Sequence, residues 1–140
     1  MVEPGKQPGP LQNDRSRECF VLVIDDDEMV RDTLADFLVD EGYRVLVAGG
    51  GDEALRLLAS SAPRPSLIIL DLKMPNLDGW GFRARQAQDP ALASIPVIVV
   101  TAAPNAIADA AAVLRKPLRL AHLASAMQAI LAGPPESERS

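Results

Sequence analysis

Short apolar runs alternate along this chain with segments of helical periodicity. The runs hold four to six residues and are rich in Val and Ile, as buried strands are, and the segments between them place apolar residues on one helical face. Strands buried on both faces and separated by helices are typical of a parallel sheet with right-handed crossovers. The alternation therefore predicts an α/β fold, a doubly wound parallel sheet with helices on both faces.

The element boundaries follow from the apolar runs and the turn residues. The predicted strands are Phe20–Ile24, Tyr43–Ala48, Ser66–Leu70, Ile95–Val100 and a weaker Ala111–Leu114. The predicted helices are Glu28–Glu41, Asp52–Ser60, one capped by Asp78 that runs to about Gln88, and Arg119–Ala132. Gly42 is expected to end the first helix. Between Thr101 and Lys116 the pattern supports only a short piece of helix before the weak strand.

Composition places the chain among ordinary soluble domains. It has 140 residues, of which 48% are hydrophobic and 24% charged, enough for one domain with one core. Residues 1–17 and 133–140 show no periodic apolar face, so we expect disordered tails around an ordered domain at 18–132. The start has no apolar signal segment, and Ile95–Leu114 is broken by prolines and polar residues. We expect a cytoplasmic protein without a membrane span.

Charge and cysteine content exclude several functions. The formal net charge of −5 argues against direct nucleic-acid binding, which normally needs a basic patch. Cys19 and His122 are the single cysteine and the single histidine, so the sequence offers neither an internal disulfide nor a Cys/His zinc cluster. We expect Cys19 to pack in the core and His122 to lie on a helix surface.

Acidic, hydroxyl and lysine side chains follow the predicted strands. Asp25 and Asp26 follow the first strand, Asp71 the third, Thr101 the fourth and Lys116 the weak fifth. In open parallel sheets, ligands bind beyond the carboxyl ends of the strands, where the strand order reverses. Clustered carboxylates repel unless a cation neutralises them, and all-oxygen ligands suit Mg²⁺. A lysine and a hydroxyl beside them suit a phosphoryl group, so we predict a metal-assisted phosphoryl site.

Each of these residues also has a simpler interpretation when it is taken alone. Asp27, which follows the acidic pair, is a good helix N-cap. Thr101 is an ordinary residue for a strand end, and Lys116 would be a surface charge with Pro117 starting the last helix. The combination at one edge of the sheet is what favours the phosphoryl site.

Five segments resemble, in the right order, the receiver domains of two-component response regulators. They are "VLVIDDDEMVR", "AGGGDEAL", "LIILDLKMPNLDGW", "VIVVTA" and "RKP", and the third contains that family's D-x-x-M-P-x-x-D-G pattern. The resemblance covers about Glu18 to Ala132. It implies a five-stranded flavodoxin-like fold with strand order 2-1-3-4-5, an order that comes from the resemblance and not from the spacing of the residues.

The resemblance also implies roles for the candidate site residues. Asp71 would be the phosphoacceptor, taking a phosphoryl group from a sensor histidine kinase or a phosphotransfer protein. Lys116 and Thr101 would bind phosphoryl oxygens, so the chain would catalyse at most its own phosphorylation and dephosphorylation. The implied Mg²⁺ ligands are Asp25 through a water, Asp26, Asp71 and the backbone carbonyl of Lys73. Met74-Pro75 and Asp78-Gly79 would shape the loop, and phosphorylation would switch the binding of an unidentified downstream protein, with a homodimer also open.

The sequence departs from the receiver pattern after the fourth strand. The fifteen positions from Thr101 to Lys116 are fewer than the family usually has, so the helix after the fourth strand is expected to be shortened or absent. Val113 stands where the family usually has a rotating Tyr or Phe. These departures leave open a receiver-like scaffold for protein interactions, regulated without phosphorylation.

Two further classes fit less well. A haloacid-dehalogenase-type phosphatase needs D-x-D-x-[TV] on the first strand, and here Asp25-x-Asp27 is followed by Met29 in the last position. A dinucleotide-binding loop is suggested by Gly49-x-Gly51-x-x-Ala54. That segment follows the second strand, however, and the chain is short for a dehydrogenase.

Overall fold

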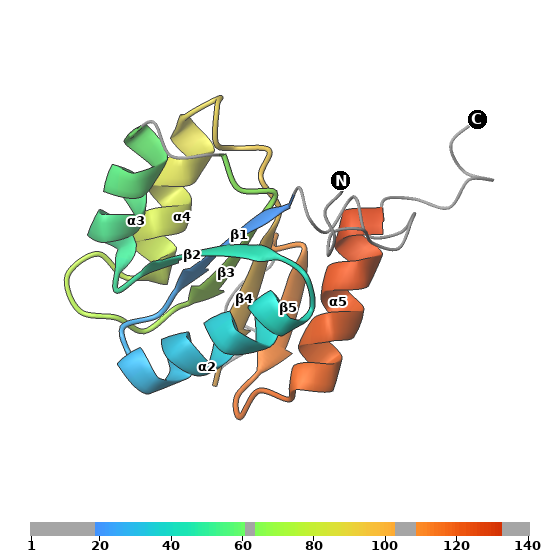
Figure 1. Cartoon of the computed structure of the whole chain (residues 1–140). Coiled ribbons are helices and arrows are strands. Elements are labelled where there is room, and N and C mark those ends of the chain that lie inside the picture. Colours follow the sequence, from blue (N-terminus) through green and yellow to red (C-terminus); the bar gives the residue numbers. More distant parts are fainter. Residues whose placement is uncertain (1–18, 61–63, 103–108, 133–140) are drawn as a thin grey trace, which may run out of the picture.

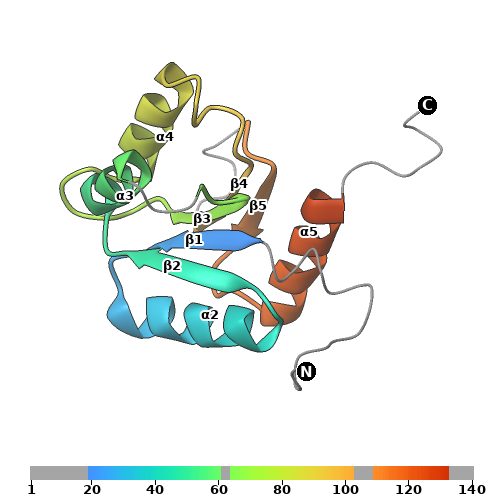
Figure 2. The ribbon, with the colours of Figure 1, turned by 45° about the horizontal axis from the view of Figure 1, so that its top comes forward.

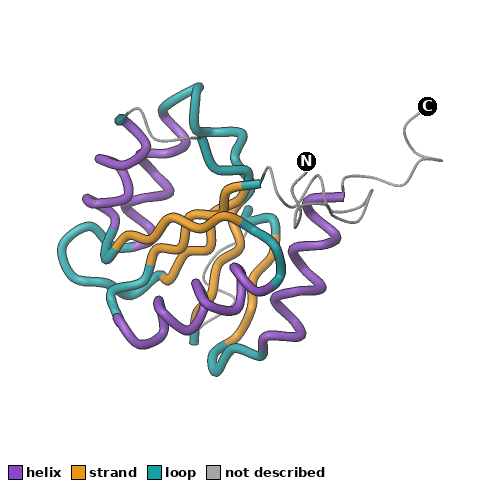
Figure 3. The backbone as a smooth tube through the Cα atoms, in the orientation of Figure 1, coloured by secondary structure: helices purple, strands orange, loops and turns teal. Residues whose placement is uncertain are grey.

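The computed structural model describes residues 19–60, 64–102 and 109–132, and these form one five-stranded parallel sheet with helices on both faces (Figure 1). The strands are β1 (Phe20–Ile24), β2 (Arg44–Ala48), β3 (Leu67–Asp71), β4 (Val97–Thr101) and β5 (Ala112–Arg115). Their order is β2-β1-β3-β4-β5, and every neighbouring pair is parallel. Figure 3 shows the strands in orange, with the helices in purple around them. The predicted fold and strand order are confirmed. The predicted tails at 1–17 and 133–140 lie outside the described residues.

In the described part of the chain, two helices cover each face of the sheet. They are α2 (Glu28–Asp40), α3 (Gly51–Ala59), α4 (Gly79–Gln88) and α5 (Leu120–Ala132). Figures 1 and 2 show α3 and α4 on one face and α2 and α5 on the other. No described helix is both long and apolar enough to cross a membrane.

Alternate strand residues build two separate apolar cores. On the α3–α4 face, Ile24 and Leu70 are buried with Phe82 of α4. On the α2–α5 face, Val23 and Ile69 are buried with helix residues such as Leu38 and Leu123. Each fully buried side chain of this size stabilises the fold by about 1.5–3 kcal/mol relative to exposure. Because both faces of β1 and β3 are covered, the carboxyl ends of these central strands are held firmly.

The predicted helix caps are present. Asp27 is the N-cap of α2, and its carboxylate accepts hydrogen bonds from the backbone N–H groups of Met29 and Val30 at 3.0 and 3.2 Å. Asp78 caps α4 in the same way and accepts from Gly81 N–H at 2.9 Å. Gly42 follows the last residues of α2 with a φ of 99°, the left-handed conformation that glycine adopts without strain.

The structure corrects some boundaries by one or two residues. β3 and β4 extend through Asp71 and Thr101, which pair with Val100 and Arg115 in the ladders. Both candidate site residues are therefore the last residues of strands and do not follow them, as the apolar runs alone had suggested. β4 begins at Val97 instead of Ile95, and α3 begins at Gly51 instead of Asp52. Cutting the elements where the apolar run ends misses polar residues that still belong to the ladder.

Polar contacts with α4 hold the connection between β4 and β5. Of that connection, the structure describes Ala102 and residues 109–111, and these residues contain no helix. The Arg83 guanidinium on α4 donates to the Asp109 carboxylate at 2.7 Å and to the Gln86 side-chain oxygen at 3.3 Å. The buried Gln86 amide donates in turn to the carbonyls of Leu92 and Ile95. The described part agrees with the predicted shortening of the helix after β4.

Candidate functional site

The acidic loop after β1 is fixed by backbone hydrogen bonds. Asp25 N–H donates to the Ala48 carbonyl of β2 at 3.1 Å, which continues the ladder one residue past the strand. The Asp25 carboxylate accepts from Asp27 N–H at 2.9 Å. Asp25 is only 4% exposed, whereas the next residue, Asp26, is exposed. The loop thus presents one buried and one solvent-facing carboxylate side by side.

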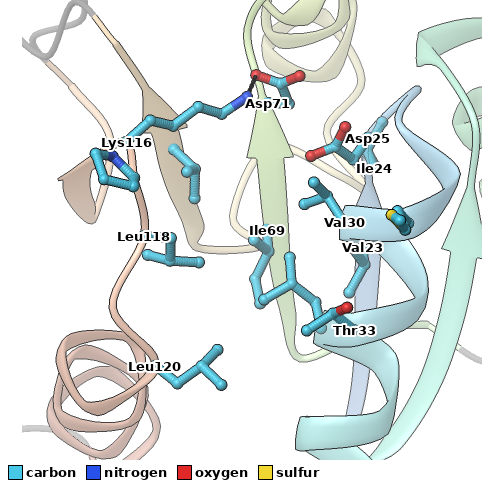
Figure 4. Close-up of a pocket in the computed structure, with 14 residues that line it drawn as sticks. Val23, Ile24, Asp25, Val30, Thr33, Ile69, Asp71, Lys116, Leu118 and Leu120 are labelled. Carbon is cyan, nitrogen blue, oxygen red and sulfur yellow. Dashed lines mark ion pairs between the residues drawn. The ribbon is translucent and has the colours of Figure 1, made fainter.

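Asp71 lies at the end of the central strand β3 and forms an ion pair with Lys116. The Lys116 ammonium is 3.1 Å from an Asp71 carboxylate oxygen, and Asp71 is 5% exposed (Figure 4). Lys116 N–H donates to the Thr101 carbonyl at 3.0 Å, so the ladder between β4 and β5 places the lysine at the same edge of the sheet. This ion pair gives the buried phosphoacceptor candidate a positive countercharge.

Three carboxylates converge at this edge. One oxygen from each of Asp25, Asp26 and Asp71 can be chosen so that all three lie within 4.8 Å of one another. Burial raises the pKa of Asp25 above its usual value; the Asp27 amide lowers it, and the charge of Asp71 raises it again. An all-oxygen set of close, partly buried carboxylates, with one of them open to solvent, fits a hard divalent cation such as Mg²⁺.

Thr101 and Lys73 complete the predicted set. Thr101 is the last residue of β4 and is 3% exposed, beside Asp71 in the sheet order. Lys73 lies two residues after Asp71 in the loop between β3 and α4, with an exposed side chain. The structure therefore gathers the predicted residues of four strand ends at one edge of the sheet.

Gly79 lets α4 approach the end of β3. A Cβ atom at this position would lie 2.7 Å from the Asp71 carbonyl oxygen and 2.7 Å from the Leu72 Cα, which no larger residue tolerates. Gly79 N–H also donates to the Leu72 carbonyl at 2.9 Å. The Asp78-Gly79 pair thus caps α4 and seats it on the strand that carries Asp71, in agreement with the predicted structural role.

A groove that sequence reasoning missed opens beside the carboxylates. A cavity of about 470 Å³ runs between α2 and α5, with Asp25, Asp71 and Lys116 at one end and mainly apolar walls (Figure 4). Met29 on its α2 side is 73% exposed, and Val30 beside it in the sequence is 37% exposed. Helical periodicity gives the apolar face of each helix but not the separation between two helices, so only exposed apolar residues in the first turn could have signalled the groove.

These features define a class of protein before any comparison is made. The fold is a doubly wound α/β domain whose carboxyl edge joins a carboxylate cluster to a lysine, a combination suited to binding a cation and a phosphoryl group.

Comparison with known proteins identifies the family. Residues 21–128 match the response regulator receiver domain, and the chain belongs to this family. It is 40% identical over 120 residues to response regulator MprA of Mycolicibacterium vanbaalenii, covering 79% of this chain and 49% of that protein. The MprA of Mycobacterium ulcerans is 39% identical over 120 residues, with the same coverage. The chain spans about half the length of the curated relatives it matches.

Solved structures agree. A putative response regulator from Chloroflexus aurantiacus superposes with a TM-score of 0.74 at 30% identity, covering 81% of this chain and 98% of that one. The signal receiver domain of a signal transduction histidine kinase from Syntrophus aciditrophicus gives 0.72 at 29% identity, covering 87% and 96%. The predicted family is confirmed.

Proposed function

We propose that this receiver domain accepts a phosphoryl group on Asp71 in a Mg²⁺-dependent reaction and thereby switches the binding of a downstream protein. The donor would be a phosphohistidine of a sensor histidine kinase or of a phosphotransfer protein. The observation that carries the proposal is the Asp71–Lys116 ion pair of 3.1 Å beside two further carboxylates. This arrangement supplies a nucleophile, a countercharge and a cation site within one edge of the sheet.

The proposal gives each side chain a task. An Asp71 oxygen attacks the phosphorus, the phosphorus–nitrogen bond to the donor histidine breaks, and the electron pair leaves with the imidazole. Lys116 pairs with a phosphoryl oxygen and Thr101 donates a hydrogen bond to another. Asp26, Asp71 and the Lys73 carbonyl would hold Mg²⁺, with Asp25 bound to it through a water. When bound, the cation offsets the charge that three carboxylates and a phosphoryl group bring together.

The apolar groove supports an approach by a protein donor. It opens beside Asp71 and Lys116, and its walls include the exposed Met29 and Val30 on α2. An exposed apolar surface next to a reactive group is typical of a protein interaction site. A donor that docks there would bring its histidine to the Asp71 edge.

Two features of the β4–β5 side favour the alternative, a receiver-like scaffold that is not phosphorylated. Val113 is small where the family usually has an aromatic residue, and the connection before it is short. The complete set of carboxylates, lysine and threonine favours phosphorylation, because a scaffold would have no need to keep repelling charges together.

Intact mass spectrometry tests the proposal. With a small acyl phosphate and Mg²⁺, the protein should gain the mass of one phosphoryl group, and Asp71→Asn should gain none. Asp27→Asn is the matched control, because asparagine keeps the N-cap and Asp27 has no proposed part in the chemistry; it should be labelled as the wild type is. Labelling that persists in Asp71→Asn would overturn the assignment of Asp71.

A further inference from the structure

Arg31 ties the acidic loop to the helix that follows it. Its guanidinium Nη1 donates to the backbone carbonyl of Asp25 at 3.1 Å, and the backbone N–H of Arg31 donates to the carbonyl of Asp27 at 2.9 Å. Ile24 is the last residue of β1 paired with both neighbouring strands, so the ladder no longer serves the Asp25 carbonyl. A buried carbonyl needs a donor, and Arg31 supplies it.

The arginine is also seated against the loop between β2 and α3. A Cβ atom at Gly49 would lie 3.1 Å from Arg31 Nη1 and 3.4 Å from a Glu53 carboxylate oxygen. That same carboxylate accepts from Gly49 N–H at 2.8 Å. The guanidinium and the Glu53 carboxylate therefore flank one backbone position, and the absence of a side chain at Gly49 leaves room for the arginine.

We propose that Arg31 is a positioning residue for the metal ligands Asp25 and Asp26, a role that rests on the function proposed above. The carboxylates of these residues and of Asp71 lie close enough to repel, which tends to push the loop away from β3. Within the described residues, the Arg31 guanidinium bonds to the backbone carbonyl of Asp25 and not to a carboxylate, so it holds the backbone from which the Asp25 side chain projects. Holding the ligands at their binding spacing before the cation arrives lowers the cost of binding it.

The sign of the mutational effect separates positioning from simple electrostatics. If Arg31 acted only as a positive charge near the site, its removal would strengthen the binding of a cation. If Arg31 acts by holding the loop, its removal weakens cation binding despite the more favourable charge. Residues that orient metal ligands from behind typically account for about 10–100-fold in metal affinity.

Calorimetric titration with Mg²⁺ tests this with a small set of variants. Arg31→Met, which keeps the length and loses the donors, should weaken binding by about tenfold. Arg31→Lys, which keeps the charge and one donor group, should restore part of the affinity. Gly49→Ala leaves every charge in place but crowds Arg31 Nη1, so it should weaken binding by a smaller factor. Arg56→Met is the control for the loss of one positive charge, because Arg56 is exposed in the last turn of α3; it should not weaken binding.

Two readouts keep the inference falsifiable. Unchanged or tighter Mg²⁺ binding in Arg31→Met, with urea unfolding showing a folded protein, would overturn it. If Arg31→Met does not fold, Arg31→Lys and Gly49→Ala decide by the same criterion. If the wild type binds no Mg²⁺, the Mg²⁺ dependence in the proposed function is wrong. Hydrogen exchange of the Asp27 backbone amide then tests whether Arg31 positions the loop. Faster exchange in the Arg31 variants supports it, and unchanged exchange overturns it.

Discussion

The carboxyl ends of β1 and β3 and the β4–β5 side of this domain are held together by different means. At β1 and β3, backbone ladders, an N-cap and the close approach of Gly79 fix the carboxylates. On the β4–β5 side, a ladder joins the two strands as well, and Ala111 N–H donates to the Val97 carbonyl at 2.9 Å. The described part of the connection, however, is tied to α4 by a side chain, through the Arg83–Asp109 pair. The first region keeps every residue that the receiver pattern asks for, and the second departs from it. The difference suggests that the phosphoryl chemistry and its transmission are separable in this chain.

The Arg83–Asp109 pair shows why the second region is held less firmly. A hydrogen bond from Arg83, together with its charge, lowers the pKa of Asp109, but the Asp109 side chain is 81% exposed. Exposed ion pairs of this kind contribute little to stability because water screens them. The buried Gln86, which accepts a hydrogen bond from Arg83, is held from the other side, because its amide donates to the carbonyls of Leu92 and Ile95 in the connection between α4 and β4.

The largest expected effect comes from removing a proposed metal ligand in the first region. Asp26→Ala should abolish Mg²⁺ binding, because it deletes the solvent-facing carboxylate of the cluster. Calorimetry measures this directly, and Trp80, in the first turn of α4 after the loop that follows Asp71, offers a fluorescence signal. A Mg²⁺ affinity equal to that of the wild type would contradict the proposed cation site at the ends of β1 and β3.

A smaller effect is expected where the two regions meet. Lys116→Met should slow phosphorylation by a small acyl phosphate by about tenfold to a hundredfold, because it removes the countercharge at Asp71. The rate of mass gain in the wild type and the variant gives the ratio. A variant that is labelled as fast as the wild type would show that the ion pair serves the fold and not the chemistry.

The smallest effect is expected on the β4–β5 side. Val113 is partly buried against the α3–α4 core, so Val113→Ala should lower the free energy of unfolding by roughly 1–2 kcal/mol, as for the loss of partly buried methyl groups. Phosphorylation-dependent partner binding should stay nearly intact, because valine has little volume to move. Urea denaturation and a binding assay with the phosphorylated protein measure the two quantities. Loss of binding at unchanged stability would mean that Val113 is itself the switch.

The fold class and the candidate site residues could be predicted because both leave local patterns in the sequence. Apolar runs mark the strands, and the polar residues at their ends fall at one edge of the sheet. The groove beside Asp71 and the role of Arg31 were not predicted, because both depend on the three-dimensional arrangement of separate elements. In the sequence, Arg31 cannot be told from an ordinary surface arginine. Its hydrogen bond to the Asp25 carbonyl, six positions earlier, forms only once the acidic loop and the start of α2 are folded.

Phosphorylation of Asp71 is expected to change the edge of the sheet that holds the site and not to act through an aromatic rotation on β5. A ligand shifts a conformational equilibrium only through contacts that differ between the two states, and Thr101 and Lys116 are the residues placed to make them. We predict changes at Thr101, Ala102 and Lys116, with any extension toward α5 running through Pro117. The response is expected within the Thr101–Asn105 loop and near Lys116, and residues 103–105 of that loop lie outside the described part of the chain.

Hydrogen exchange with and without phosphorylation, on the wild type and on Thr101→Ala, tests this claim most directly. We predict that the changes in protection on phosphorylation concentrate around Thr101 and Lys116, with little change at Val113. In Thr101→Ala, Asp71 should still be labelled, but these changes in protection should be lost. Changes concentrated at Val113 and α5, together with a normal response in Thr101→Ala, would contradict it.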